Sequence, residues 1–342
     1  MHFEYFIGVD IASDTFVATT LEKSLKPLLV AKEFSNDPDG FDAFVTWLTA
    51  AKVDKRTAVI CMEATGVYAE ALCYCLHAQD WWVAVHPPLE VKRAFAPVGH
   101  KTDPVDSCQI AEYAVRFTDK LRRWQPRKAL LEQIRTLLNT REQFVRQKTM
   151  HKNTLHALKR KPVRTPLAEK LLLESIAHFT KNIKSIESEI KDLIKKDDNL
   201  YGQFLLLLTI PGVGLLLASH VLVLMASLHS MHNPKAVSAW LGISPYEKRS
   251  GTSVFGKAHS RGYGPTTMRK LLHLAARSVR THNPVFQKYF ERKVAEGKSK
   301  KLVLNNISNK LVKIICAVLR ENKPYIPNYQ SINPAVLSLT KS

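Results

Sequence analysis

Short apolar runs separated by polar breaks occupy the first 127 residues of the chain. Where β-branched and apolar residues gather we expect strands, at residues 5–9, 15–21, 28–34, 57–62 and 82–85. Residues 38–51 and 67–78 instead carry apolar side chains at helical spacing. Strands that alternate with helices in this way predict an α/β domain over residues 1–127.

From residue 128 the apolar spacing becomes helical and long. Steps of four and three alternate through Leu172, Ile176, Phe179, Ile183, Ile186, Ile190 and Leu193, which is the a/d seam of a coiled coil. A helix with a looser seam precedes it at residues 131–158, and the basic, proline-punctuated segment 159–166 lies between the two. The pattern therefore predicts an antiparallel coiled-coil hairpin over residues 128–200.

Residues 201–325 are mostly helical in pattern, and the proline-containing tail 326–342 is expected to be extended. The uncharged stretch 204–228 is long enough to be considered as a membrane span, but Pro211-Gly212-Val213-Gly214 breaks it into two short pieces. We therefore expect two buried helices joined by a tight turn, and no membrane. The functional alternative is a helix-hairpin-helix motif, in which Gly212 and Gly214 let backbone N–H groups approach a phosphate.

Charge indicates the kind of partner. Lysine and arginine number 50 against 30 aspartates and glutamates, which gives a net charge of +20 and favours binding to polyanions, nucleic acid above all. The five cysteines show no paired CxxC spacing, and no basic region precedes an apolar stretch at the N-terminus. We expect a cytosolic protein whose cysteines are reduced core residues.

Four carboxylates are placed as a metal-dependent nuclease needs them. Asp10 and Glu63 each close a buried apolar strand, where an uncompensated charge is costly. Asp103 and Asp106 lie in an Asp-Pro-x-Asp sequence, which by itself is more typical of a helix start with Asp103 as the N-cap. Because hard oxygen ligands suit Mg²⁺, or Mn²⁺, we expect the four acids to bind that cofactor.

A polar segment at residues 244–253 predicts a loop. Ser250 lies in it after Lys248 and Arg249, two cations suited to holding a scissile phosphate while a serine attacks. On residue pattern alone, Ser-Gly-Thr-Ser is more often an ordinary turn.

Together these segments resemble the DEDD transposases of the RuvC-like class, the insertion-sequence recombinases that include bridge-RNA-guided members. The segments are Gly8–Ala12, Met62–Tyr68, Lys101–Asp106, Ile210–Gly214, Gly242–Pro245 and Arg249–Ser253. Two departures stand out: Ser107 occupies a position where the family usually has alanine, and His259–Gly264 differs from the usual serine-lysine-x-glycine stretch.

The resemblance implies a ribonuclease-H-like (RuvC-like) domain with Mg²⁺ on the four acids, a coiled coil for assembly, and a C-terminal domain with Ser250 as nucleophile. Its partners would be donor and target DNA and a guide (bridge) RNA, with a homodimer assembling to a tetramer. Its location would be the bacterial cytoplasm, in association with the nucleoid. Candidate nucleic-acid contacts are Lys101, Arg141, Arg146, Lys148, Lys152, Lys159, Arg160, Lys161, Gly212, Gly214, Lys248, Arg249, Arg269 and Lys270.

Other interpretations of the residues stay open at this point. The basic face of the helix at 131–158 is also compatible with a solvated surface. The same four acids would serve a Holliday-junction-type endonuclease that uses water, for which Ser250 is dispensable. A basic scaffold without enzymatic activity would need neither the acids nor the serine.

Overall fold

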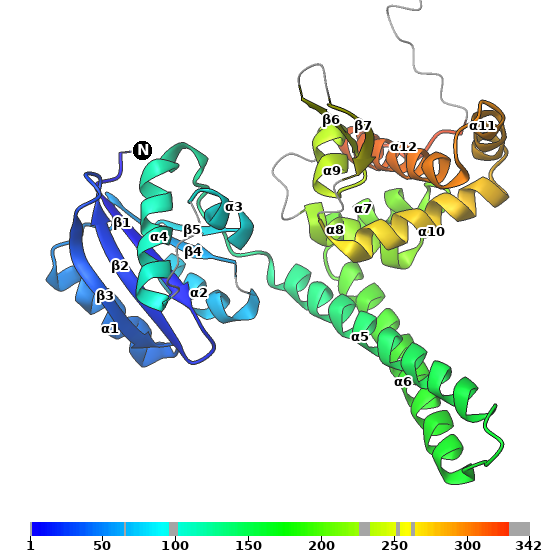
Figure 1. The fold of residues 1–342 in the computed structure, drawn as a ribbon, viewed down its shortest axis with the longest axis horizontal. Helices are drawn as coiled ribbons and strands as arrows, with labels where there is room; N and C mark the ends of the chain where they lie inside the picture. The colour runs from blue at the N-terminus through cyan, green and yellow to red at the C-terminus, as the bar shows by residue number, and fades with distance from the viewer. Residues whose placement is uncertain are drawn as a thin grey trace, which may run out of the picture. The chain divides into compact units, whose positions relative to one another are not determined.

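The computed structural model describes residues 2–64, 66–95, 102–225, 233–250, 254–260 and 264–327 (Figure 1). The chain forms two compact units, Met1–Pro126 and Arg127–Ser342. Mixed α/β structure in the first unit and mostly helical structure in the second agree with the fold class expected from the sequence.

A five-stranded sheet in the order β3-β2-β1-β4-β5 forms the centre of the first unit. Its first three strands are antiparallel neighbours, whereas β4 and β5 run parallel to β1. The strands are β1 (Tyr5–Ile11), β2 (Thr15–Glu22), β3 (Pro27–Ser35), β4 (Ala58–Glu63) and β5 (Val83–His86). All five were expected from the apolar runs, and each end lies within two residues of its predicted position.

Helices cover both faces of this sheet, and Figure 1 shows α1 and α4 on opposite sides of it. On one face α1 (Pro38–Ala50) and α2 (Glu70–Ala78) share a core with Ile7 and Val9 of β1, and a 3₁₀ turn, η1 (Gly66–Ala69), leads into α2. On the other face α3 (Pro88–Arg93) and α4 (Asp103–Arg116) pack against Phe6 and Cys61, and η2 (Thr118–Lys120) follows α4. Successive strand residues point to opposite faces, so Gly8 and Asp10 belong to the α4 face.

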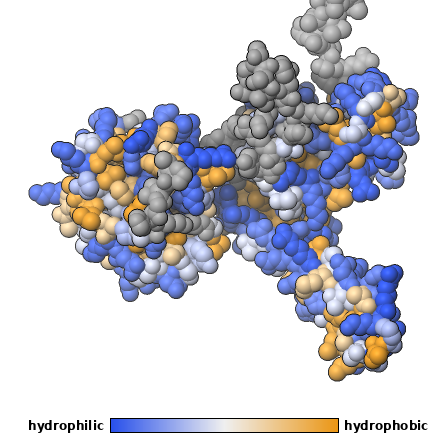
Figure 2. All heavy atoms as spheres, in the orientation of Figure 1, coloured by the Kyte–Doolittle hydropathy of each residue, from blue (hydrophilic) through white to orange (hydrophobic). Residues whose placement is uncertain are grey.

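Two helices of equal length, α5 (Ala129–Leu158) and α6 (Pro166–Lys195), open the second unit as an antiparallel hairpin. The predicted α6 seam packs within the chain, because Ile183 and Ile190 are buried and the ring of Phe179 lies 5.7 Å from that of Phe144 on α5. Near the free end of the hairpin apolar side chains are exposed among hydrophilic ones (Figure 2), Leu167 and Leu171 among them.

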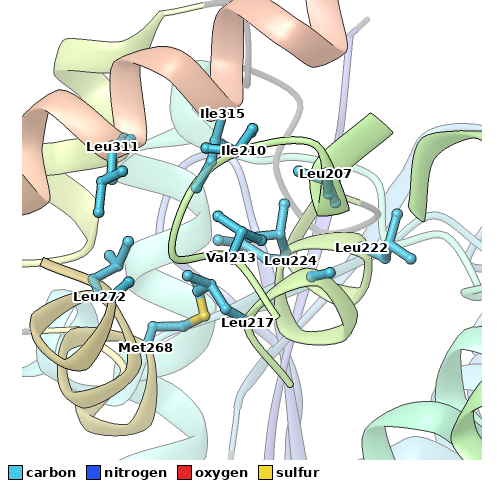
Figure 3. Packing of buried hydrophobic residues seen from close by; sticks show 14 of the residues in the cluster. Leu207, Ile210, Val213, Leu217, Leu222, Leu224, Met268, Leu272, Leu311 and Ile315 are labelled. Atoms are coloured by element: carbon cyan, nitrogen blue, oxygen red, sulfur yellow. The ribbon is translucent and has the colours of Figure 1, made fainter. Parts of the chain in front are cut away.

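The remaining helices enclose one apolar core together with the base of the hairpin (Figure 3). They are α7 (Asp198–Leu208), α8 (Leu215–Met225), α9 (Pro234–Trp240), α10 (Thr266–His282), α11 (Pro284–Ala295) and α12 (Lys300–Glu321). The uncharged stretch thus forms two short helices, α7 and α8, as expected. In the described part of the chain α12 is the one helix long and apolar enough to cross a bilayer, but Val303, Ile307 and Leu311 on it are fully buried in this core.

The segment expected to be a polar loop is a β-hairpin. β6 (Pro245–Ser250) pairs with β7 (Val254–Ser260) in antiparallel register, and Ser250 is the last residue of β6, paired with Val254. The loop prediction was wrong because β6 has no apolar alternation, and backbone pairing with β7 organises it instead.

Candidate active site and nucleic-acid interface

Asp10 and Glu63 end two adjacent parallel strands. Val9 pairs with Met62 across β1 and β4, so the two acids occupy the next position on strands that lie about 4.8 Å apart. Each is partly exposed, whereas the residue before it is fully buried. Both follow, by two residues, a position covered by α4. The carboxylates therefore leave the sheet at the same edge and on the same face.

The backbone of α4 lies directly on β1, and Gly8 makes this possible. A Cβ added at Gly8 would meet the carbonyl oxygen of Ser107 at 2.0 Å and the nitrogen of Ala111 at 2.3 Å. The Ser107 hydroxyl is 2.8 Å from that of Thr19 on β2 and also donates to the carbonyl of Pro104 at 3.0 Å. The serine that departs from the family pattern thus ties the start of α4 to the sheet.

Asp103 and Asp106 lie in the first turn of α4, beside the positive end of the helix dipole. Thr102, not Asp103, occupies the N-cap position, and its side chain makes no capping hydrogen bond. The N-cap interpretation of Asp103 was therefore wrong. Because Ser107 is fixed over Gly8, this turn is attached to the strand that carries Asp10.

The donor set suits a hard divalent cation, since all four side chains offer carboxylate oxygens. Two of them, Asp10 and Glu63, are brought to adjacent strand ends, and the other two share one helical turn. In the described residues no three acidic, histidine or cysteine side chains converge closely enough to hold a metal ion. Lys101, which precedes this turn, lies outside the described residues.

His86 is a polar side chain at the same sheet edge that the sequence analysis missed. It ends β5 in register with Glu63, and its ring lies 5.2 Å from that of Tyr113 on α4. Burial lowers the pKa of His86, although Glu90, with its Oε2 3.6 Å from Nδ1, opposes this shift. Within the described ranges its buried Nε2 has no hydrogen-bond partner. The same signal that singled out Asp10 and Glu63, a polar residue closing an apolar strand, marks His86.

Ser250 and the cations before it, Lys248 and Arg249, belong to β6, whose backbone the structure describes without their side chains. The next three residues, 251–253, lie outside the described ranges. The register with β7 places Ser250 at the closed end of the hairpin. Of the divergent stretch His259–Gly264, residues 261–263 are likewise outside.

Several cations expected to contact nucleic acid have partners within the protein. Arg141 donates to Glu187 of α6 at 2.7 Å and is only 18% exposed. Arg146 and Lys270 both approach Glu142, at 3.7 and 3.2 Å. Arg269 donates to the carbonyl of Gly264 at 3.0 Å. The Arg141 contact joins α5 to α6, the Lys270 contact joins α5 to α10, and the Arg269 contact fixes the start of α10, so these three cations have a structural role.

Cations farther along the hairpin are placed differently. Lys152, Arg160 and Lys161 are exposed, Lys148 is partly exposed, and none of the four forms an ion pair with a described residue. Lys159, also exposed, is close enough to Glu169 to lower the pKa of that carboxyl, although Arg164 lowers it more. The distal half of the hairpin is therefore the part of this face with cations available to a polyanion.

The two glycines of the turn between α7 and α8 differ. Gly212 has φ +78°, and a Cβ there would lie 2.7 Å from Val279 and 3.0 Å from the carbonyl of Ala275 on α10. It is needed for the turn and for close packing. Gly214 has no atom within 4 Å of an added Cβ, so its backbone, just before the N-terminus of α8, faces open space. Of the two, Gly214 is the one placed to approach a phosphate.

Comparison with known proteins identifies the family. The chain matches the model of the DEDD transposases of the IS110 type over residues 7–160 and that of the transposase IS116/IS110/IS902 family over residues 205–291. It is 28% identical over 323 residues to the pilin gene-inverting proteins of Moraxella lacunata and Moraxella bovis, covering 94% of this chain and 97% of each relative.

A further relative is the insertion element IS110 uncharacterized 43.6 kDa protein of Streptomyces coelicolor, 25% identical over 154 residues, which are 45% of this chain and 37% of that protein. The segment matched by the first family model includes all four candidate acids, and the segment matched by the second includes Ser250. The chain belongs to the IS110 family of transposases and is a DNA transposase or recombinase.

Proposed function

We propose that this recombinase cuts and rejoins donor and target DNA to move its own insertion sequence, with Asp10, Glu63, Asp103 and Asp106 as Mg²⁺ ligands and Ser250 as nucleophile. The observation that carries the proposal is the placement of Asp10 and Glu63 one residue beyond the last registered pair of two adjacent strands, on the face to which Gly8 and Ser107 fix the start of α4. No hydrophobic core requires two acids at that edge.

The four carboxylates would hold Mg²⁺, or Mn²⁺, which when bound would supply charge stabilisation to the phosphate and the leaving oxygen. The chain itself keeps the acids in place. The Ser107 hydroxyl, which contacts Thr19 and the Pro104 carbonyl, resists movement of the α4 turn that carries Asp103 and Asp106. The pairing of β1 with β4 fixes the spacing of Asp10 and Glu63.

Ser250 would carry out the exchange of phosphodiester bonds. Its Oγ attacks the scissile phosphorus, the P–O3′ bond breaks, and the serine proton ends on the leaving 3′-oxygen, so that the 5′-phosphate is esterified to the protein. Attack of a 3′-hydroxyl from the other duplex reverses the step and releases the serine. Lys248 and Arg249 would hold the phosphate through both steps.

A structured RNA would choose the sites, as in other RNA-guided systems. The chain has a large positive charge and shows neither helix-turn-helix nor zinc-finger spacing, so its contacts should be mainly to phosphates and sugars. The cations along the distal hairpin, among them the exposed Lys152 and Lys161, suit such contacts.

Assembly into a dimer, and a tetramer with both DNAs, would use the free end of the hairpin, since the α6 seam is already occupied by α5. Leu167 and Leu171 are 67% and 54% exposed one helical turn apart. Glutamate at these two positions should shift sedimentation toward monomer with the helix content kept. Glutamate at Ile183, which is buried against α5, should instead unfold the hairpin.

Reconstitution from purified protein, the RNA encoded beside its gene and two DNA duplexes tests the proposed function. Changing the pairing segment of the RNA should redirect recombination to the complementary target. Site-specific recombination that persists after complete removal of RNA would refute guidance and leave the acid and serine assignments to be tested separately. Lys152→Gln with Lys161→Gln should weaken RNA binding, whereas Arg141→Gln should lower thermal stability because it leaves Glu187 without its partner.

A further inference from the structure

Cations gather around one tyrosine where α11 meets α12, at a place not assigned to any step above. The Lys310 ammonium lies 4.7 Å from the centre of the Tyr289 ring, and the Arg292 guanidinium lies 5.8 Å from the same centre. Lys313 follows Lys310 by three residues, on the same side of α12. Figure 1 shows α11 beside the end of α12. We call Tyr289, Arg292, Lys310 and Lys313 the α11–α12 basic cluster.

These charges repel one another. Burial lowers the pKa of Lys310, and the charges of Lys313, Arg292 and Lys293 lower it further. Little negative charge offsets this repulsion, because Glu296 pairs with Lys293 at 2.6 Å and lies 3.9 Å from Arg292. In the described part of the chain neither Lys310 nor Lys313 forms an ion pair. A fold has no stability reason to concentrate like charges in this way.

The surrounding sequence makes the imbalance larger. Residues 264–327 contain 14 lysines and arginines and only three acids, Glu291, Glu296 and Glu321. Glu296 forms ion pairs with Lys293 and Arg292 of α11, and Glu321 lies 3.0 Å from Arg320. Ten of these cations lie in residues 284–327, which include α11 and α12, and the three acids are too few to neutralise them.

We propose that the α11–α12 basic cluster binds the sugar-phosphate backbone of duplex DNA. Charge complementarity identifies the occupant, because DNA is the polyanion on which a transposase acts and carries a phosphate every 3.4 Å or so along each strand. Lysines at i and i+3 have Cβ atoms about 5–6 Å apart, so their long side chains reach neighbouring phosphates. The Tyr289 ring attracts the charged ends of Lys310 and Arg292 and so holds the two side chains in place between the helices.

Most of the cluster lies outside the segments that match the family models. The second match ends at residue 291, before Arg292, Lys310 and Lys313. The cluster would thus be a DNA contact of this chain added to the catalytic parts. It requires only that the protein binds DNA, and it holds whether or not the serine and metal assignments hold.

The test is a double variant, Lys310→Gln with Lys313→Gln, in the full chain freed of RNA. The matched control is Lys23→Gln with Lys26→Gln, which removes two exposed lysines from the first unit. Affinity for a duplex of about 30 base pairs is measured by fluorescence anisotropy between about 50 and 200 mM KCl. Loss of two phosphate contacts should reduce the slope of log K against log salt by about 1.8, which over this fourfold range is about a 12-fold difference.

The control pair should leave the slope unchanged. An equal change of slope in the cluster and control variants, or no change in the cluster variant, would overturn the proposal. A cluster variant that loses binding to an RNA hairpin but keeps its affinity for duplex DNA would also overturn it. Thermal stability of the cluster variant should stay the same or rise, because a repulsion has been removed. If it falls instead, the single Lys313→Gln variant, at an exposed position, decides the question through the same slope.

Discussion

Gly8→Ala is the substitution that tests most sharply how the first unit places the α4 acids. The added methyl carbon would lie 2.0 Å from the Ser107 carbonyl oxygen, where an ordinary contact begins at 3.4 Å, so α4 has to retreat by about 1.4 Å. Both clashing groups are backbone atoms, so no change of side-chain rotamer relieves the clash. The retreat would also separate the Ser107 hydroxyl from Thr19.

Two effects of different size should follow. Overpacking of this kind lowers the free energy of unfolding by about 1–3 kcal/mol, which for a domain of this size lowers the melting temperature by roughly 5–10 °C. Activity should fall further, because misplacing catalytic groups by about 1 Å costs on the order of 100-fold. Recombination measured well below the melting temperature, beside DNA binding by anisotropy, should show lost activity with binding retained.

Gly202→Ala is the matched control. This glycine lies inside α7, and an added Cβ there meets no atom within 4 Å, so the substitution should stabilise the helix by about 0.5–1 kcal/mol and leave activity intact. Wild-type recombination together with an unchanged melting temperature in Gly8→Ala would show that the contact between α4 and β1 does not control the site.

Further predictions concern the acids, the turn glycines and one histidine. Asp10→Asn and Glu63→Gln should each abolish strand cleavage in Mg²⁺ while DNA binding stays intact, since adjacent carboxylates repel one another without a cation; parallel loss of binding and cleavage would contradict this. Gly212→Ala should lower the melting temperature, because its φ is positive and its Cβ would press on α10, whereas Gly214→Ala should not; equal effects would contradict the distinction. Burial lowers the pKa of His220 to about 4, so the native state excludes a proton that the unfolded chain binds below pH 6.5. Stability should therefore decline as pH falls from 6.5 toward 4, by up to about 3 kcal/mol, and denaturant titrations of His220→Leu should show a flatter profile.

Much of the first unit could be predicted because β1, β2, β4 and β5 are mostly buried on both faces. Such strands appear in sequence as short continuous apolar runs, and an acid at the end of one, as at Asp10 and Glu63, is conspicuous. His86 also closes an apolar strand, but that strand has only four residues and two prolines follow it, so the sequence there indicates a strand end more strongly than a functional side chain.

The second unit shows what sequence patterns miss. β6 shows no alternation of apolar and polar residues, and it forms a strand because it pairs with β7, which no local periodicity encodes. The sequence predicts the basic face of α5, but it does not show which of its cations are paired within the protein. Arg141 is neutralised by Glu187, 46 residues away. Only the folded hairpin separates such structural cations from those available to a polyanion. The intrachain packing of the α6 seam likewise depends on which helix turns back onto it.

The central claim is that Ser250 joins the protein to DNA, and one measurement tests it directly. The purified protein is incubated with Mg²⁺, guide RNA and labelled donor duplex, then denatured, and DNA that migrates with the polypeptide is quantified. Wild type should form an adduct that maps by mass spectrometry to Ser250, and Ser250→Ala should form none while binding DNA as tightly as wild type. Normal cleavage by Ser250→Ala without an adduct would contradict the account and favour water as the nucleophile on the same four acids.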